Sequence, residues 1–345
     1  MYEAEDVTPF GIGVILNSLN LADIARQTKA ADENGFSSVS VGDNPEHMLD
    51  TYVSLTYAAQ AAERCHVGTT ITTPIHRDPL VVATAFSSVE TIHRGHVFIG
   101  IGTGRARQKS SIRELREHIV ALRELWSSGK STFRGVDMRL SWDANPVPIV
   151  LCASGPRALR LGGELADAVI VESGLTPELI ENAKRQVADG ALAAGRNPSD
   201  IKLCWYARTS IGSTEVAAVD DCLPSMAAAG AFLSRRTSGL DDVPTQHHAK
   251  LRTLAEKYDM SAHFRTDRDN PNRRLLDDEP LRDYLIERMG VVGTPAQWVS
   301  RIDRLRELGV HNILCVGAGS DKDAMIDLVG QYVIPKLAGV SSGAS

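Results

Sequence analysis

Hydrophobic residues along this chain follow two alternating patterns. Short runs of apolar and β-branched residues, typical of buried strands, are each followed by a segment in which apolar residues recur at helical spacing. The runs predict strands over residues 10–16, 37–41, 67–72, 97–101, 148–153, 167–172, 201–209 and 311–316. The other segments predict helices over residues 21–34, 51–64, 80–92, 110–127, 157–166, 177–194, 214–229, 295–308 and 321–337. Such strand–helix–strand units place consecutive strands parallel, with a right-handed crossover.

Strands that alternate with helices in this way predict an α/β protein with a (β/α)8 TIM barrel fold. A doubly wound open sheet is the alternative, but the first strand lacks a G-x-G-x-x-G turn and the glycines of residues 100–104 have the wrong spacing for one. We expect a single domain over residues 1–338. Charged residues cluster in residues 230–293, which predicts a lid-like insertion between the seventh helix and the eighth strand. Residues 339–345 are expected to be a disordered tail.

Composition narrows the classes of partner. The chain carries 37 Lys and Arg against 43 Asp and Glu, a net charge of −6, which gives no electrostatic support for binding nucleic acid. No apolar run approaches the roughly 20 residues that cross a bilayer, and the acidic start MYEAEDVTPF is unlike a signal peptide. We therefore expect a cytoplasmic protein without a membrane partner. The five scattered cysteines predict buried thiols, and no cluster has metal-ligand spacing.

In a barrel the chemistry lies at the carboxyl ends of the strands, so the residues that follow each predicted strand form the candidate site. They include no G-x-S-x-G hydrolase motif and no H-E-x-x-H metal motif. Instead they are small residues, exposed backbone and a few hydrogen-bonding side chains, a set suited to holding a flat cofactor. The candidates are Asn17, Asp43, Asn44, residues 70–73, His76, Arg77, residues 102–108, Ser154, Gly155, Glu172, Ser173 and residues 208–210.

Residues 153–157 (ASGPR) carry the clearest local signal. A predicted strand ends there, and a helix begins with Pro156 in its first turn. The free N–H groups and the dipole of such a helix start are suited to a phosphate, whereas the alternative is that Gly155 and Pro156 only punctuate the turn. From the residues alone, both interpretations stay open.

Other candidates have an ordinary structural interpretation as well. The β-branched residues 70–73 extend the third strand if they have no special role, and Asp43 caps a turn or helix, as aspartate after glycine commonly does. His76 and Arg77 either bind an anionic substrate or lie solvated on the rim. Without a family comparison, the structural interpretation is favoured for each.

Several motifs in order along nearly the whole chain resemble the bacterial luciferase-like flavin and deazaflavin oxidoreductases, in particular the branch that uses coenzyme F420. The motifs are residues 31–36 (ADENGF), 67–74 (VGTTITTP) with Arg77 and Pro79, 99–104 (IGIGTG), 153–156 (ASGP) with 163–167 (GELAD), and 292–295 (VGTP) with 308–310 (LGV). The F420 branch is favoured over FMN because the fifth strand leads into S-G-P, whereas the FMN branch more often shows A-G-x-S.

The resemblance implies a barrel in which a bulge after the third strand supports the cofactor, with a non-prolyl cis peptide that here joins Thr70 and Ile71. It implies that Asp43 hydrogen-bonds the polar edge of the deazaflavin ring and that Gln108 contacts the ring or its side chain. Further cofactor residues implied are Thr72, Gly102 and Ala153, with Ser154 and Gly155 binding the phosphate through backbone N–H groups. Substrate is expected at His76, Arg77 and Glu172. Family precedent suggests a homodimer.

Two positions depart from the sugar-phosphate dehydrogenases of this branch. Those enzymes have a histidine where this chain has Asn44, and a glutamate where it has Arg105. The loss of both proton-transfer groups argues against oxidation of a sugar phosphate, and the cationic Arg105 favours an anionic or electron-rich substrate.

We therefore expect an F420-dependent oxidoreductase that transfers a hydride between F420 and a small organic substrate, with Asp43, Asn44 and Arg105 at the catalytic positions. One alternative is a two-component FMN monooxygenase that uses O2 and reduced flavin from a separate reductase. The other is a flavin-binding protein of this family without turnover.

Overall fold

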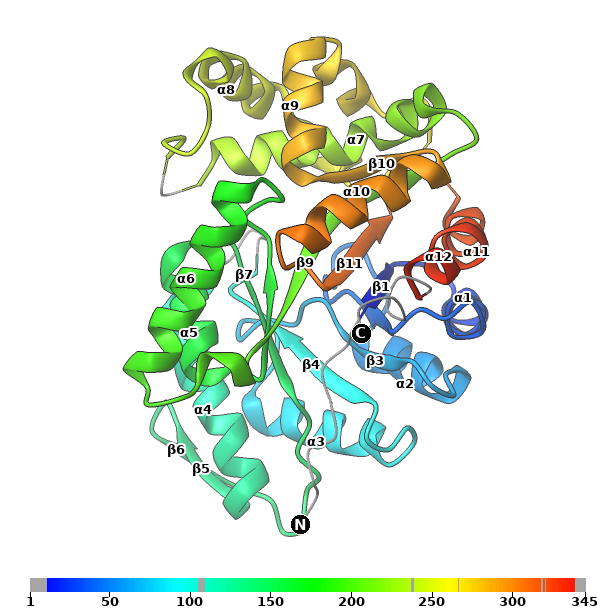
Figure 1. Cartoon of the computed structure of the whole chain (residues 1–345). Coiled ribbons are helices and arrows are strands. Elements are labelled where there is room, and N and C mark those ends of the chain that lie inside the picture. Colours follow the sequence, from blue (N-terminus) through cyan, green and yellow to red (C-terminus); the bar gives the residue numbers. More distant parts are fainter. Residues whose placement is uncertain are drawn as a thin grey trace, which may run out of the picture. The chain divides into compact units, whose positions relative to one another are not determined.

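The computed structural model describes residues 11–104, 109–236, 239–265, 267–317, 319 and 321–338. Its main sheet has the strand order β10-β9-β11-β1-β2-β3-β4-β7-β8, and β8 also pairs with β9, which closes a ring of eight strands (Figure 1). The strands of the ring are β1 (Gly11–Leu16), β2 (Ser38–Val41), β3 (His66–Thr69), β4 (Val97–Ile101), β7 (Ile149–Ala153), β8 (Ala168–Val171), β9 (Lys202–Ile211) and β11 (Asn312–Gly317). This topology confirms the predicted barrel over the open sheet.

Helices follow the strands at the positions that the apolar spacing predicts. They are α1 (Leu21–Glu33), α2 (Thr51–Ala61), α3 (Pro79–Glu90), α4 (Ile112–Ser128), α5 (Pro156–Leu165), α6 (Pro177–Ala193), α7 (Glu215–Ser234), α10 (Pro295–Glu307), α11 (Lys322–Tyr332) and the short α12 (Ile334–Ala338). Side-chain caps fix several starts: Asp50 accepts from the backbone N–H groups of Tyr52 and Val53, and Ser111 with Glu114 forms a capping box. These caps satisfy N–H groups that have no partner within the helix.

The sequence pattern does not reveal every element. The helix predicted over residues 214–229 continues to Ser234, and a short strand, β10 (Gly290–Gly293), pairs in parallel with β9. Between them lie α8 (His248–Lys257) and α9 (Glu279–Met289). The β5–β6 hairpin (Lys130–Phe133 and Val136–Arg139) follows α4, and the short 3-10 turns are η1 (Pro198–Asp200), η2 (Thr245–His247), η3 (Met260–Ala262) and η4 (Pro271–Leu276).

The chain divides into two compact units, which are taken separately below. Unit 1 comprises Met1–Ser173, Glu181–Trp205 and His311–Leu314, and unit 2 comprises Gly174–Ile180, Tyr206–Val310 and Cys315–Ser345. In unit 1 the strands are buried on both faces, with β2, β4 and β8 buried along their whole length. In unit 2 the core is built by α7, α8 and α9, whose buried side chains include Met226, Leu251 and Leu285. The prediction of one domain with a lid stays a prediction.

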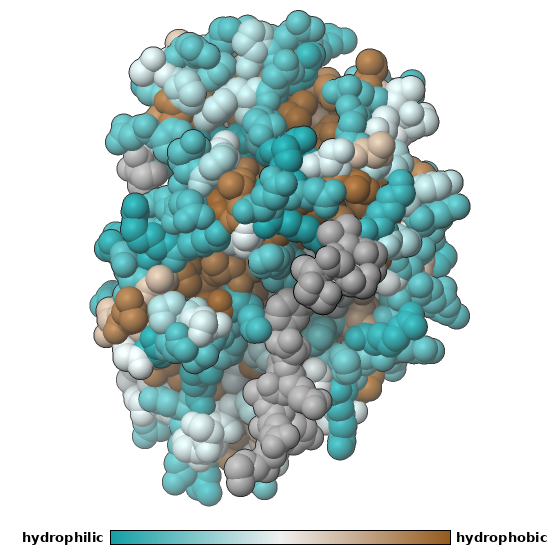
Figure 2. All heavy atoms as spheres, in the orientation of Figure 1, coloured by the Kyte–Doolittle hydropathy of each residue, from teal (hydrophilic) through white to brown (hydrophobic). Residues whose placement is uncertain are grey.

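Among the described helices, α7 alone is long and apolar enough to cross a membrane by length and composition, with 20 residues and a mean hydropathy of 1.3. The apolar stretch of α7 is therefore longer than any that was expected from the sequence. Its apolar side chains, however, pack against α8 and α9 in the core of unit 2, which is the arrangement of a core helix. On the face drawn in Figure 2, polar side chains predominate and hydrophobic ones form smaller patches among them.

Candidate active site

The chain leaves the regular sheet directly after β3. The peptide bond between Thr70 and Ile71 is cis, which confirms the bond that the resemblance implies. The backbone N–H of Thr70 donates to the carbonyl of Val41 on β2 at 2.8 Å, whereas that of Thr72 donates to the carbonyl of Gly100 on β4 at 2.9 Å. The strand thus changes partners across a bulge, and the half-buried Thr70 and Ile71 lie at its crest.

Glycines at the end of β4 let the bulge and Thr73 pack closely against this part of the backbone. A Cβ on Gly102 would lie 2.7 Å from Cδ1 of Ile71 and 3.2 Å from the carbonyl oxygen of Cys152. A Cβ on Gly104, where φ is +76°, would lie 2.9 Å from Cγ2 of Thr73. Any larger residue at position 102 presses on the bulge, so glycine there preserves the close approach of β4 to the crest.

Asp43, just beyond β2, is buried and held by hydrogen bonds to both carboxylate oxygens. Its side chain is 1% exposed. Nη1 of Arg77 donates to Oδ1 and Oδ2 at 2.7 Å, and Oγ1 of Thr72 donates to Oδ2 at 2.7 Å. Since Thr72 directly follows the bulge and Arg77 precedes α3, Asp43 ties together the end of β2, the bulge and the loop after it.

Arg77 extends this connection to α2. Its Nη2 donates to Oδ2 of Asp50 at 2.8 Å, and its guanidinium lies 4.6 Å from the ring centre of Tyr52. Burial opposes the charge of Arg77, yet hydrogen bonds and attraction from Asp43 hold its pKa above the ordinary value. Burial likewise opposes the charge of Asp50, but bonds from the backbone of Val53 and from Arg77 lower its pKa. Asp43, Arg77 and Asp50, with Thr72 and Tyr52, form what we call the Asp43 clamp.

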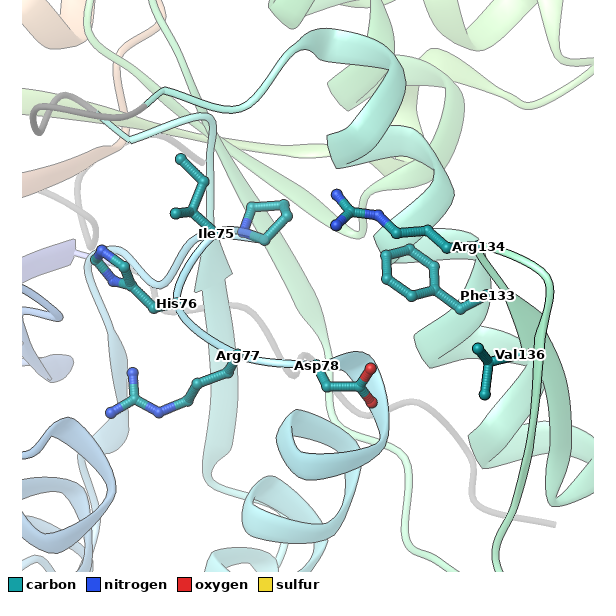
Figure 3. A pocket seen from close by; sticks show the side chains of 8 residues that line it. Ile75, His76, Arg77, Asp78, Phe133, Arg134 and Val136 are labelled. Atoms are coloured by element: carbon teal, nitrogen blue, oxygen red, sulfur yellow. The ribbon is translucent and has the colours of Figure 1, made fainter.

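His76 lies next to the clamp without being part of it. Its Nδ1 is 3.8 Å from Oδ1 of Asp43, beyond hydrogen-bond distance, and this buried atom has no hydrogen-bond partner in the described part of the chain. The side chain is 19% exposed. Figure 3 shows His76 and Arg77 directed to one side of their loop, away from Phe133 and Arg134.

A cavity of about 320 Å³ borders the same loop. Its lining is formed by residues 74–78 and, from the β5–β6 hairpin, by Phe133, Arg134 and Val136 (Figure 3). The catalytic and cofactor candidates Asp43, Thr70 and Gly102 are not among these lining residues. This cavity therefore adjoins the candidate site but does not contain it.

The end of β7 has the geometry of an anion site. Gly155 is the N-cap of α5, so no side chain caps the first N–H groups of this helix, and Pro156 occupies the first turn. A Cβ on Gly155 would meet nothing within 4 Å, and Ser154 is exposed, so the backbone here can be approached closely. The backbone N–H of Glu172, just after β8, donates to the carbonyl of Ala153 at 2.8 Å. The N–H groups and the positive dipole end of α5 suit a phosphate.

The remaining sequence candidates are placed as follows. Asn44 is half-buried, and its carbonyl accepts from the backbone N–H groups of His47 and Met48 in the turn after Asp43. Arg105 and Gln108 lie outside the described residues. Sequence reasoning did not single out Asp50 and Tyr52, which complete the Asp43 clamp. The sequence places Asp50 directly before a predicted helix, and that position by itself indicates only a helix cap.

These residues fit a flat ring with a phosphate tail. The half-buried Thr70 and Ile71 lie at the crest of the bulge, and the start of α5 offers free N–H groups. Oγ1 of Thr70 and Nδ1 of His76 are buried polar atoms without a hydrogen-bond partner in the described chain. Such atoms are costly unless something pairs with them, so their presence at the candidate site favours a bound ligand.

Comparison with known proteins agrees with this geometry. The family model described as luciferase-like monooxygenase matches residues 7–312. A 5,10-methylenetetrahydromethanopterin reductase of Methanolobus tindarius is 27% identical over 333 residues, covering 90% of this chain and 95% of the relative. An F420-dependent glucose-6-phosphate dehydrogenase of Nakamurella multipartita is 26% identical, covering 95% and 96%. The solved F420-dependent tetrahydromethanopterin reductase of Methanopyrus kandleri has a TM-score of 0.75 at 23% identity, covering 95% and 99%.

Proposed function

The chain belongs to the luciferase-like monooxygenase family, and from that premise we propose that it transfers a hydride between coenzyme F420 and a small organic substrate. The observation that carries the proposal is the bulge at Thr70 and Ile71, where the chain changes partners from β2 to β4 and glycine at position 102 lets Ile71 approach β4 closely. The relatives at 26–27% identity are named for F420 or for a reductase of a methanopterin substrate, which supports the F420 branch.

In this proposal, Thr70, Ile71, Thr72 and Gly102 hold the ring, and Ala153, Ser154 and Gly155 hold the phosphate. A bound deazaflavin supplies the hydride-carrying carbon, so the protein has to orient the substrate and exclude water. The Asp43 clamp holds the bulge in place through the hydrogen bond from Thr72 to Asp43. Since both oxygens of Asp43 already accept hydrogen bonds, Asp43 acts here by positioning Thr72 and the ring edge rather than as a mobile acid.

The proton that accompanies hydride transfer needs a separate group, and we assign it to His76. Imidazole is the usual acid or base near neutral pH. Asn44 cannot serve, because an amide does not titrate. Nδ1 of His76 lies 3.8 Å from Oδ1 of Asp43, and in this proposal Nε2 exchanges the proton with the substrate.

Replacing His76 by glutamine is expected to lower kcat by about 10²–10⁴-fold, the usual contribution of a general acid or base. The measurement is kcat with a substrate found by screening against F420. His311, which is exposed, provides the control as His311→Gln. A His76→Gln enzyme that keeps the kcat of the wild type would remove His76 from this role.

Anaerobic titration with oxidised and reduced F420, and separately with FMN, tests the cofactor. We expect F420 to bind and the protein from an F420-making host to show an absorbance band near ~420 nm. Gly102→Ala is expected to weaken F420 binding by about tenfold or more, because the added methyl displaces the side chain of Ile71 at the crest of the bulge, while the circular dichroism spectrum is kept. Tight binding of FMN together with no binding of F420 would reject the proposal.

The alternative of a two-component FMN monooxygenase then predicts oxygen consumption with externally reduced flavin. A protein that binds F420 but exchanges no hydride across a broad substrate panel would support the third possibility, a family member without turnover. A cytoplasmic location and a homodimer remain predictions from the sequence. The identity of the substrate is the finer question that the screening assay addresses.

A further inference from the structure

Arg208 is a buried cation in unit 2 that makes no ion pair with the residues the structure describes, and its guanidinium lies 5.9 Å from the ring centre of Tyr206. It lies near the carboxyl end of β9 and is 5% exposed. Its Nη1 donates to Oγ of Ser225 on α7 at 2.8 Å, and this is its one hydrogen bond in the described chain. Its Nε is buried and has no partner there. A guanidinium has several N–H donors and stays charged, so most of its capacity is unused.

Two acidic residues of the same unit make other contacts. Asp221 lies one helical turn before Ser225, and its Oδ2 is 3.5 Å from Oγ of Ser210. Asp259 accepts from the backbone N–H and the hydroxyl of Ser261 at 2.8 and 2.7 Å. A buried charge without a partner is costly, and cationic side chains are almost never buried in this way without one.

A second cation and a phenol share this neighbourhood. Tyr258 is 6% exposed, and burial raises its pKa to about 12 against the opposing charges of Arg208 and Arg235, so both guanidiniums act on the same phenol. The hydroxyl of Tyr258 lies 2.6 Å from Nδ1 of His263. Arg235 is exposed and donates to the carbonyl of Ala255. Arg208 itself has one acceptor, Oγ of Ser225, and its Nε has none in the described chain.

We propose that Arg208 binds an oxyanion, either phosphate or a carboxylate group of a small ligand. The planar edge of a guanidinium presents two N–H groups that match two oxygens of such a group, and desolvation strengthens the bond. An oxyanion on Nε and Nη2 would satisfy the unpartnered Nε and neutralise the buried charge. The sequence placed Arg208 among the residues at strand ends, but the proposed hydride transfer assigns it no role.

Thermal unfolding of the apoprotein, titrated with inorganic phosphate or acetate at constant ionic strength, tests this site. For the wild type we expect the Tm to rise with phosphate concentration, because a ligand bound only to the folded state stabilises it. Arg208→Met is expected to lose this rise, while its Tm without phosphate stays equal to or above that of the wild type, since an unpaired buried charge is removed. Arg208→Lys keeps the charge without the planar edge and is expected to weaken phosphate binding by about tenfold.

Arg252→Met is the matched control, because Arg252 is an exposed arginine on α8 in the same unit. It should leave the phosphate response unchanged. A response that survives in Arg208→Met, or a wild type that does not respond to phosphate or acetate, would overturn the proposal. Titration of Arg208→Met with F420 separates the sources of the anion: unchanged affinity assigns the site to a ligand other than the cofactor. A tenfold loss would assign the oxyanion to the cofactor and overturn a separate site. Neither phosphate result depends on the hydride-transfer proposal.

Discussion

Replacing Arg77 by methionine is expected to lower the free energy of unfolding by about 3–5 kcal/mol, the cost of leaving a buried charge without its partner. The carboxylate of Asp43 is 1% exposed and would keep only the bond from Thr72. Methionine keeps an unbranched side chain but removes the guanidinium that lies over Tyr52, so the loss reports the charge, its hydrogen bonds and this ring contact. Equilibrium denaturation followed by tryptophan fluorescence and by circular dichroism gives the value where the two transitions coincide.

The double variant Asp43→Asn/Arg77→Met separates a stranded charge from lost packing. It should recover about half or more of the loss, because no unpaired carboxylate remains. Arg113→Met is the control for removing an arginine from an ion pair as such: its pair with Glu117 is 3.9 Å long, with side chains 82% and 44% exposed. The free energy of unfolding of Arg113→Met should stay within about 1 kcal/mol of the wild-type value. An Arg77→Met protein that loses no more than this control would show that the Asp43 clamp does not stabilise the fold.

The barrel was predictable because buried parallel strands appear in a sequence as apolar runs, and their helices as regular apolar spacing. The third strand shows the limit of this method. Its apolar run continues through residues 67–72, but the regular strand ends at Thr69, and the backbone rejoins β4 only at Thr72. Hydrophobic pattern reports burial, and both the strand and the bulge are buried or half-buried. The bulge was expected only through family resemblance.

The site shows the same division between single residues and their arrangement. Asp43 and Arg77 were both candidates, but they are 34 residues apart, and no local pattern indicates that they pair. Asp50 could not be recognised as a site residue from the sequence, because its role as the cap of α2 already explains an aspartate at this position. Arg208 was a candidate from the sequence, but whether its Nε finds an acceptor depends on the residues that surround it in the fold. Whether two side chains pair depends on the tertiary structure. The sequence could therefore identify these residues as candidates, but it could not show which of them interact.

His118 on α4 is a buried titratable group outside the candidate site. The residue is fully buried, and its ring meets Phe133 edge-on with centroids 5.8 Å apart. Neither ring nitrogen has a hydrogen-bond partner in the described chain. Burial first, and then the charge of Arg134, lower the pKa of His118 from its ordinary 6.5 to about 4. The folded protein therefore keeps this imidazole neutral at pH values where the unfolded chain protonates it.

The stability that the neutral His118 contributes is fully present above pH 6.5 and is lost as the pH falls toward about 4, because in that window the unfolded chain binds one more proton. The loss amounts to about 3 kcal/mol. Replacing His118 by phenylalanine is expected to remove this loss, so the variant gains about 3 kcal/mol relative to the wild type between pH 6.5 and pH 4. Denaturant unfolding at several pH values measures it, with the exposed His47→Gln as control. Parallel curves for His118→Phe and wild type would mean that the imidazole is protonated inside the fold.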